Sequence, residues 1–286
     1  MRTRELIDEA ATLAAAQAGD RDAFGALVQP HLATLRSLAY CMLTSREDAD
    51  DAVQEGLLHA LTEIGGVRAE ASPRTWLFRI VLNICLDVLR HRGRWRADAQ
   101  LNGSRIGSDS SDHLADLATV ERDPEYRYEM AQHVAFCFSC VGRSLPPEQQ
   151  AAVMLHEVFQ HSAGEAAAVL DVTESVLRHN LSAGRRAMQE TFEGMCTLIG
   201  KTGVCYECKS FRDRAPAERR GPELTAIAPT DADARVQFAK RAALVRAADL
   251  ESGTARRLHD LLFQELAAWE AERRDQTTQP TSRRRN

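Results

Sequence analysis

The chain has 286 residues, of which 44% are hydrophobic and 27% charged, and its formal net charge at pH 7 is −5. Two or three small domains fit in a chain of this length. No apolar run approaches the roughly 18 residues that a membrane-spanning helix needs, and no secretory hydrophobic segment follows the first residues, so we expect a cytoplasmic protein without membrane insertion. β-Branched residues never alternate over a useful length, and the sequence therefore predicts an all-helical fold.

The first three predicted helices are separated by capping residues. The first helix covers residues 5–19. The second begins at an aspartate cap, Asp20 or Asp22, and its apolar spacing predicts one helix. The third begins at Thr44 or Ser45.

The third helix is acidic. Residues 46–70 contain seven acids and two bases. The apolar residues of this helix, including Leu57 and Leu61, recur with helical spacing and are expected to face a core. An acidic block directly before a basic one indicates two different partners, even though the whole chain is acidic.

A fourth helix runs into the basic block. Residues 74–96 contain six arginines and one acid. Arg79, Asn83, Asp87 and Arg90 fall on a face away from the apolar stripe. Arginines and a tryptophan beside a rigid helix suit phosphate neutralisation and base stacking, whereas a solvated arginine-rich helix end is the plainer interpretation. The predicted apolar stripe comprises Leu77, Ile80, Val81, Ile84, Val88 and Leu89.

A segment rich in glycine, serine and aspartate follows and predicts a flexible linker. It separates two helical domains, and a third segment with further amphipathic helices near 236–250 and 254–274 extends the chain. The predicted divisions are a first domain at 1–100, the linker at 101–124, a second domain at 125–195 and a C-terminal extension at 196–286.

The second domain has the pattern of a helix-turn-helix. A supporting helix starts at Ser162, residues 171–173 make the turn with Thr173 as N-cap, and a recognition helix covers 174–189. This helix is expected to pack through Val176, Leu177 and Leu181, and Gly184 within it costs about 1 kcal/mol against alanine. Its candidate DNA contacts are Ser175, Arg178, His179, Arg185 and Arg186.

Seven cysteines are many for a cytoplasmic protein without structural disulfides. Cys41 and Cys85 stand alone on apolar helix faces, which is typical of core residues. The others form two C-x-x-C pairs, with Cys196 ahead of the second, and such pairs suit a zinc site, a reversible redox pair or neither. His133 and His156 are possible substitute ligands. The candidate metal ligands are Cys137, Cys140, Cys205 and Cys208, with Cys196 as a further candidate.

Three motifs in this order resemble those of a known family. Residues 48–55 (DADDAVQE) are close to a D-x-x-D-x-V-Q-E core-binding motif, and residues 76–83 (WLFRIVLN) to a W-L-x-R-I-x-x-N promoter-melting helix. Residues 145–150 (LPPEQQ), followed by 162–186, are similar to a C-terminal helix-turn-helix domain. The chain thus resembles a bacterial RNA polymerase sigma factor of the extracytoplasmic-function (ECF) group in the sigma-70 family.

The resemblance implies a protein that is not an enzyme, with core RNA polymerase, promoter DNA and an anti-sigma factor as partners. It implies polymerase binding by Asp48, Asp51, Gln54 and Glu55. The loop at 67–73 would hold a flipped minus-ten base, the helix-turn-helix would bind the minus-thirty-five element, and arginines would hold phosphates. The residues that would serve minus-ten DNA are Arg68, Trp76, Arg79, Asn83, Asp87, Arg90, Arg92, Arg94 and Arg96.

Two other functions remain open at this point. The first is a metal- or redox-sensing helix-turn-helix regulator that works without polymerase, which leaves the acidic motif unexplained. The second is a thiol–disulfide oxidoreductase that uses one C-x-x-C pair, and it is disfavoured because no βαβ pattern surrounds either pair.

Overall fold

The computed structural model describes residues 2–67, 72–92, 137–195 and 234–247. All regular elements within these ranges are helical, which confirms the predicted fold class. None of the helices described is long and apolar enough to cross a membrane. The predicted linker at 101–124, most of the C-terminal extension and the helix expected near 254–274 lie outside the described residues.

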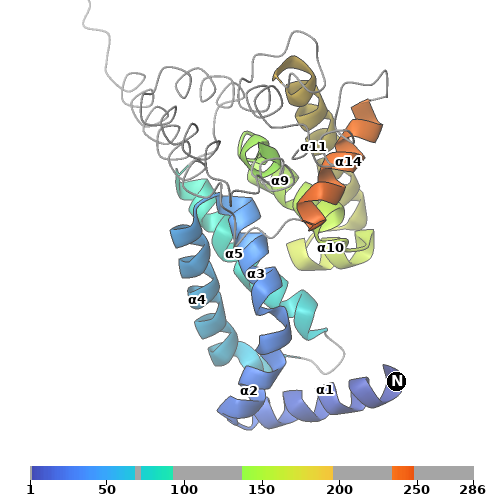
Figure 1. Cartoon of the computed structure of the whole chain (residues 1–286). Helices are drawn as coiled ribbons and strands as arrows, with labels where there is room; N and C mark the ends of the chain where they lie inside the picture. Colours follow the sequence, from blue (N-terminus) through green and yellow to red (C-terminus); the bar gives the residue numbers. More distant parts are fainter. Residues whose placement is uncertain (1, 68–71, 93–136, 196–233, 248–286) are drawn as a thin grey trace, which may run out of the picture. The chain divides into compact units, whose positions relative to one another are not determined.

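The chain separates into two compact units. The first contains Met1–Arg94 and Pro146–Arg185, and the second contains Trp95–Leu145 and Arg186–Asn286. In the first unit, an N-terminal helical bundle is followed by a helix-turn-helix module (Figure 1). The bundle contains α1 (Arg2–Gln17), α2 (Arg21–Val28), η1 (Gln29–His31), α3 (Leu32–Leu43), α4 (Arg46–Glu63), η2 (Ile64–Gly66) and α5 (Pro73–Arg92). The module contains α9 (Pro147–Val153), a π-helical turn η3 (Met154–Val158), α10 (Ala163–Leu170) and α11 (Glu174–Met195). The last turns of α11 belong to the second unit, which also contains α14 (Ala234–Ala247).

The prediction of one helix after Asp20 is wrong. The structure has two helices, α2 and α3, joined by the 3-10 turn η1 with Pro30 at its start. Proline has no amide hydrogen to donate, and its ring clashes with the carbonyl four residues earlier, so a straight helix cannot continue through this position.

Side-chain caps fix where the bundle helices begin. The Asp20 carboxylate accepts hydrogen bonds from the amides of Asp22 (2.9 Å) and Ala23 (3.1 Å). Ser45, rather than Thr44, caps α4, because its hydroxyl accepts the amide of Asp48 at 3.3 Å. Thr44 instead ends α3 in the left-handed region, with φ of 59°. Each cap satisfies amides that the first turn of a helix leaves without a partner.

The core of the bundle lies among α3, α4 and α5. Helix α5 buries a wider sector than its predicted stripe, since Phe78, Leu82, Cys85 and Leu86 are buried in addition to Leu77, Val81 and Leu89. Three predicted members of the stripe, Ile80, Ile84 and Val88, are only half-buried. Helix α5 packs on the module as well as on the bundle, and Phe78 takes part in this second contact through Phe159 and His161.

The two isolated cysteines are core residues, as predicted. Cys41 and Cys85 are both fully buried. Burial raises the pKa of the Cys85 thiol to about 12, so this residue stays protonated and unreactive at neutral pH.

The helix-turn-helix begins and turns where the sequence predicts. The Ser162 hydroxyl accepts the Glu165 amide (3.2 Å), and the Glu165 carboxylate accepts the Ser162 amide (2.8 Å), which is a capping box. Asp171 ends α10 with φ of 55°, and the Thr173 hydroxyl accepts the amide of Val176 at 3.3 Å.

Two expectations about the recognition helix need correction. Val176 does not pack in the core, because 46% of its surface is exposed. Gly184 is not a weak point: a Cβ added there would lie 2.8 Å from Val153 Cγ2 and 3.1 Å from the Gln149 carbonyl oxygen. The absence of a side chain therefore lets α11 approach α9 closely.

The second unit has an aromatic core. Phe138, in a helical stretch at 137–142, lies 6.2 Å from Phe192 of α11 and 5.4 Å from Phe238 of α14, measured between ring centroids. The buried Arg241 guanidinium lies 4.5 Å from the Phe192 centroid. Helix α14 of the extension is thus packed against the end of the recognition helix, and it buries the face that its sequence predicts through Phe238 and Val245.

Candidate nucleic-acid interface

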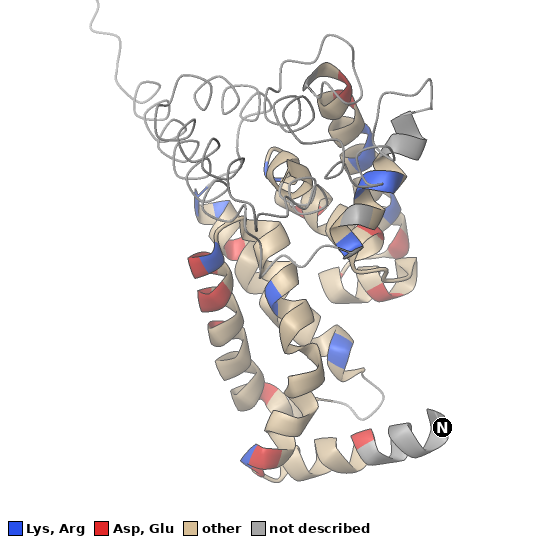
Figure 2. Cartoon of the chain, in the orientation of Figure 1, with Lys and Arg blue, Asp and Glu red and all other residues tan. Residues whose placement is uncertain are grey.

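Helix α4 presents an acidic surface with apolar neighbours. Figure 2 shows acidic segments along α4. Asp51, Gln54 and Glu55 of this helix are exposed. Leu58 and Leu61 are also exposed, by 59% and 39%, although the spacing of Leu61 predicted a core position. Residues three and four apart share one helix face, so these five side chains form one strip, which we call the α4 surface.

Asp48 and Arg92 are bound to each other. Sequence analysis assigned them to different partners, polymerase and DNA. In the structure both Arg92 guanidinium nitrogens contact the Asp48 carboxylate, with one bond of 2.8 Å to Oδ1, and only 18% of the Asp48 side chain is exposed. This pair joins the start of α4 to the end of α5.

The first helix holds the chain at Val67, the last described residue before the predicted minus-ten loop. The Gln17 side-chain amide donates to the carbonyls of Ile64 (3.2 Å) and Val67 (2.7 Å). Trp76 packs against the apolar cluster that includes Leu13, so its ring has a structural role beside its predicted DNA contact. Sequence analysis missed Gln17, and Arg68 lies outside the described residues.

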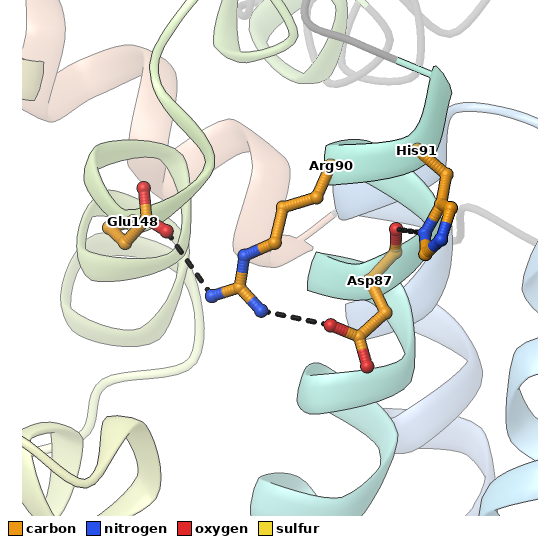
Figure 3. Close-up of polar contacts among 4 residues, drawn as sticks. All are labelled: Asp87, Arg90, His91 and Glu148. Atoms are coloured by element: carbon orange, nitrogen blue, oxygen red, sulfur yellow. Dashed lines mark hydrogen bonds and ion pairs between the residues drawn. The ribbon is translucent and has the colours of Figure 1, made fainter.

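The predicted DNA face of α5 carries a polar row. Asn83, Asp87 and Arg90 are exposed. Arg90 donates to Asp87 at 2.9 Å and to Glu148 of α9 at 3.2 Å, and His91 Nδ1 lies 2.8 Å from the Asp87 carbonyl (Figure 3). One arginine thus connects the polar row to the helix-turn-helix module.

Two further α5 arginines contact the module through main-chain oxygens. Arg79 donates from Nε to the Ala168 carbonyl at 3.1 Å and lies 3.6 Å from the Asp171 carboxylate. Arg74 donates to the Phe159 carbonyl at 3.0 Å. These carbonyls lie at helix ends, where acceptors are left over and where the helix dipole favours a cation.

A buried glutamine makes the reciprocal contact. Gln150 of α9 is 1% exposed, and its amide nitrogen donates to the carbonyls of Cys41 (3.2 Å) and Met42 (3.0 Å) at the end of α3. We call the contacts of α3 and α5 with α9, η3 and α10 the α5 interface; both sides of it belong to the first unit. Sequence analysis missed this interface, although Gln150 and Glu148 stand in one of its motifs.

His161 lies inside the α5 interface. It is 2% exposed, and its ring centroid is 4.8 Å from that of Phe78, which also contacts Phe159 at 5.8 Å. Neither ring nitrogen has a hydrogen-bond partner in the part of the chain described. Burial, and then the positive charge of Arg74, lower the pKa of His161, so the imidazole is neutral at pH 7.

The recognition helix exposes a mixed surface. Ser175, His179 and Arg186 are exposed at predicted DNA positions. Arg178 is paired with Glu174 one turn earlier. Arg185 is held by Glu157 of η3, with Nε 2.6 Å from the carboxylate, so it braces the module rather than projecting freely from it.

The cysteine cluster is described only in part. Cys137 is half-buried and Cys140 is buried, while Cys196, Cys205 and Cys208 lie outside the described residues. Within the described ranges, no three metal-ligating side chains come together. The zinc site stays a prediction. Arg94, Arg96 and His133 also fall outside these ranges.

Comparisons with known proteins give a consistent result. A family model described as Sigma-70 region 2 matches residues 27–95, and one described as Sigma-70, region 4 matches residues 137–188. The chain is 32% identical over 177 residues to the ECF RNA polymerase sigma factor SigM of Mycobacterium tuberculosis, covering 62% of this chain and 81% of SigM. It is 30% identical over 179 residues to SigG of the same species, covering 59% of this chain and 48% of SigG. A solved structure of CnrH in complex with the cytosolic domain of CnrY covers 65% of this chain and 97% of CnrH, with a TM-score of 0.46 and 21% identity.

Proposed function

This chain belongs to the ECF group of the sigma-70 family of RNA polymerase sigma factors, and we propose that it binds core RNA polymerase, recognises the minus-ten and minus-thirty-five promoter elements and promotes transcription initiation. The observation that carries this proposal is that three polar surfaces follow one another along the chain. They are the α4 surface, the polar row of α5 and the exposed face of the recognition helix α11. They serve three different partners, which are a basic protein surface, separated DNA strands and duplex DNA.

Polymerase binding is assigned to the α4 surface. Asp51 and Glu55 supply negative charge, Gln54 supplies hydrogen bonds, and the exposed Leu58 and Leu61 supply apolar area. Protein interfaces combine an apolar centre with polar neighbours, and charge complementarity speeds association. Asp48 supports this surface by holding the end of α5 through Arg92.

Promoter DNA is assigned to α5 and α11. Asn83 and Asp87 are short polar side chains suited to base edges, while Arg90 is suited to phosphate. Separating a base from its stack costs a few kcal/mol, and contacts made only to separated strands offset that cost. On α11, Ser175, Arg178 and His179 lie in the first turns, which enter the major groove in helix-turn-helix proteins.

Metal or redox control through the C-terminal cysteines is a further part of the proposal. The support for this part of the proposal is the position of Cys140 in the fold. Cys140 is buried in the stretch whose Phe138 packs on Phe238 of α14, so a change at this cysteine pair acts on the packing of the extension. Zinc would use Cys137 and Cys140 with Cys205 and Cys208. Measurement of metal content and thiol count on purified chain, with and without chelator, tests this part.

The central experiment separates polymerase binding from folding. Asp51→Lys with Glu55→Lys should abolish co-purification with core polymerase and run-off transcription, with unchanged helicity, because exposed charges contribute little to folding stability. Glu63→Lys, at an exposed acid further along α4, is the matched control and should keep both activities. Undiminished polymerase binding by the double variant would contradict the assignment.

A second experiment tests melting. Asn83→Ala should weaken transcription from a duplex promoter more than from one with a pre-melted minus-ten region, because the residue acts on separated strands. An equal loss on both templates would show that Asn83 does not act in melting.

A further inference from the structure

Exposed large hydrophobic side chains lie at two places among the described residues. Leu58 and Leu61 belong to the α4 surface, and Val172 and Val176 lie at the start of the recognition helix. Val172, in the turn after α10, is 36% exposed, and Val176, in the first turn of α11, is 46% exposed. The proposed function assigns a contact to the two leucines and none to the two valines.

Hydrogen bonds fix the main chain at both valines. The Val172 amide donates to the Ala167 carbonyl of α10 at 3.0 Å, and the Val176 amide donates to the Thr173 hydroxyl at 3.3 Å. Valine is β-branched, so few rotamers are open to its side chain, above all in a helix. The methyl groups of Val176 are therefore held in a defined position, and ordering them against a partner costs little entropy.

The arginines of the same helix suit a different base. Arginine binds the two acceptors of guanine in the major groove. Arg178 is also paired with Glu174 within the chain. Arg185 is held by Glu157, with Nε 2.6 Å from the carboxylate. Neither arginine distinguishes thymine from the other bases by its methyl group.

Of the four standard bases, thymine alone places a methyl group in the major groove, and apolar side chains contact it there. The first residues of the second helix of a helix-turn-helix lie against base edges. Val176 stands at such a position, between the exposed polar residues Ser175 and His179. A thymine methyl is thus the apolar group on promoter DNA that this side chain can cover.

We propose that Val176 reads the C5 methyl group of a thymine in the minus-thirty-five element and is a specificity-determining residue of α11. This inference rests on the proposed function of α11 and adds an apolar contact to its polar ones. Covering one methyl group removes both it and the valine methyls from water, which is worth a few-fold in affinity.

Replacing thymine by deoxyuridine tests the proposal, because the two bases differ only in this methyl group. Core polymerase loaded with the full-length chain is titrated against a promoter identified by run-off transcription, with each thymine on either strand of the minus-thirty-five region replaced singly. Replacement of the thymine that Val176 reads should weaken wild-type binding about three- to fivefold. Val176→Ala should weaken binding to the thymine promoter by a similar factor and lose nothing further with deoxyuridine at that position.

Ser182→Ala, at another exposed position of α11, is the matched control. It should keep the full deoxyuridine loss of the wild-type chain. Because Val176 is exposed and its amide remains available to Thr173, Val176→Ala should keep the wild-type urea midpoint, so that its binding defect is not a folding defect.

The outcomes distinguish this inference from the proposed function. If the wild-type chain transcribes with core polymerase but no deoxyuridine weakens its binding, or if Val176→Ala shows the same deoxyuridine loss as wild type, Val176 does not read a thymine methyl. If Val176→Ala instead loses co-purification with core polymerase, the exposed valine contacts protein and the inference is wrong. If the wild-type chain neither binds core polymerase nor transcribes, the proposed function itself fails.

Discussion

Gly184 shows how one residue decides the packing of the recognition helix. Alanine has the higher helix propensity, by about 1 kcal/mol, so propensity alone predicts that Gly184→Ala stabilises α11. The added Cβ would lie 2.8 Å from Val153 Cγ2, a distance that forces a shift in a packed core. Overpacking of this kind costs about 1–3 kcal/mol, so we expect a net loss of stability in urea unfolding.

Gly194 in the same helix is the matched control for this substitution. A Cβ added there meets nothing within 4 Å. Gly194→Ala should therefore raise the free energy of unfolding by up to about 1 kcal/mol. If Gly184→Ala stabilises the chain as Gly194→Ala does, α11 does not depend on close approach to α9.

His161 makes the stability of the first unit depend on pH. Burial first, and then Arg74, lower the pKa of this imidazole from 6.5, whereas Glu165 acts in the opposite direction. Below about pH 6.5 the unfolded chain therefore binds a proton that the folded chain does not, and stability falls as the pH drops. His161→Phe keeps a ring against Phe78 and should flatten the decline in unfolding free energy between about pH 7 and pH 5.5.

A second histidine contributes to the same slope. The pKa of His31 is also lowered, by burial and then by Arg74, so part of the slope should remain in His161→Phe. An unaltered slope in His161→Phe would contradict the lowered pKa of His161, because it would mean that this imidazole binds its proton equally well in the folded and the unfolded chain.

At the scale of elements, the pairing of α4 with α5 gives two acids of α4 different roles: Asp48 holds α5, whereas Asp51 is proposed to bind polymerase. Asp48 is largely covered by Arg92, while Asp51 is exposed. Asp48→Asn should weaken polymerase binding less than Asp51→Asn does, and should cost no more than about 1 kcal/mol of stability, since Arg92 is half-exposed. Pull-down titration and urea unfolding of both variants check this, and an equal loss of polymerase binding would place Asp48 on the binding surface.

Elements defined by local chemistry could be predicted from the sequence. Ser45, Ser162 and Thr173 cap their helices because a hydroxyl beside the first turn accepts free amides, a signal confined to a few residues. The break at Pro30 was readable from the same kind of signal and was missed.

The α5 interface was not predictable in this way. Gln150 meets the Met42 carbonyl across 108 positions of sequence, and no periodicity encodes that contact. Part of the buried sector of α5 follows from this interface, because Phe78 is fully buried and its ring contacts Phe159 and His161 of the module. The spacing of Asn83, Asp87 and Arg90 placed them on one face, and all three are exposed, whereas the partners of Arg90 within the chain required the fold.

At the scale of the whole molecule, the α4 surface and the α5 interface of the first unit are supported by the same pair of helices, α4 and α5. These two helices approach closely at Gly56, where an added Cβ would lie 2.8 Å from Val81 Cγ2.

The described helix of the C-terminal extension, α14, packs at the far end of α11. Phe238 of α14 is 4% exposed and packs on Phe138, which in turn packs on Phe192 of the recognition helix. Phe238→Ala removes a buried ring and should lower the free energy of unfolding of the second unit by about 3 kcal/mol. Lys240→Ala, at a half-exposed position on the same helix, is the control and should change the free energy of unfolding by less than about 0.5 kcal/mol.

Because the Phe238 ring supports the end of α11, Phe238→Ala should also alter run-off transcription, as should truncation after Thr191. Wild-type unfolding and transcription in Phe238→Ala would show that α14 neither stabilises nor regulates the recognition helix.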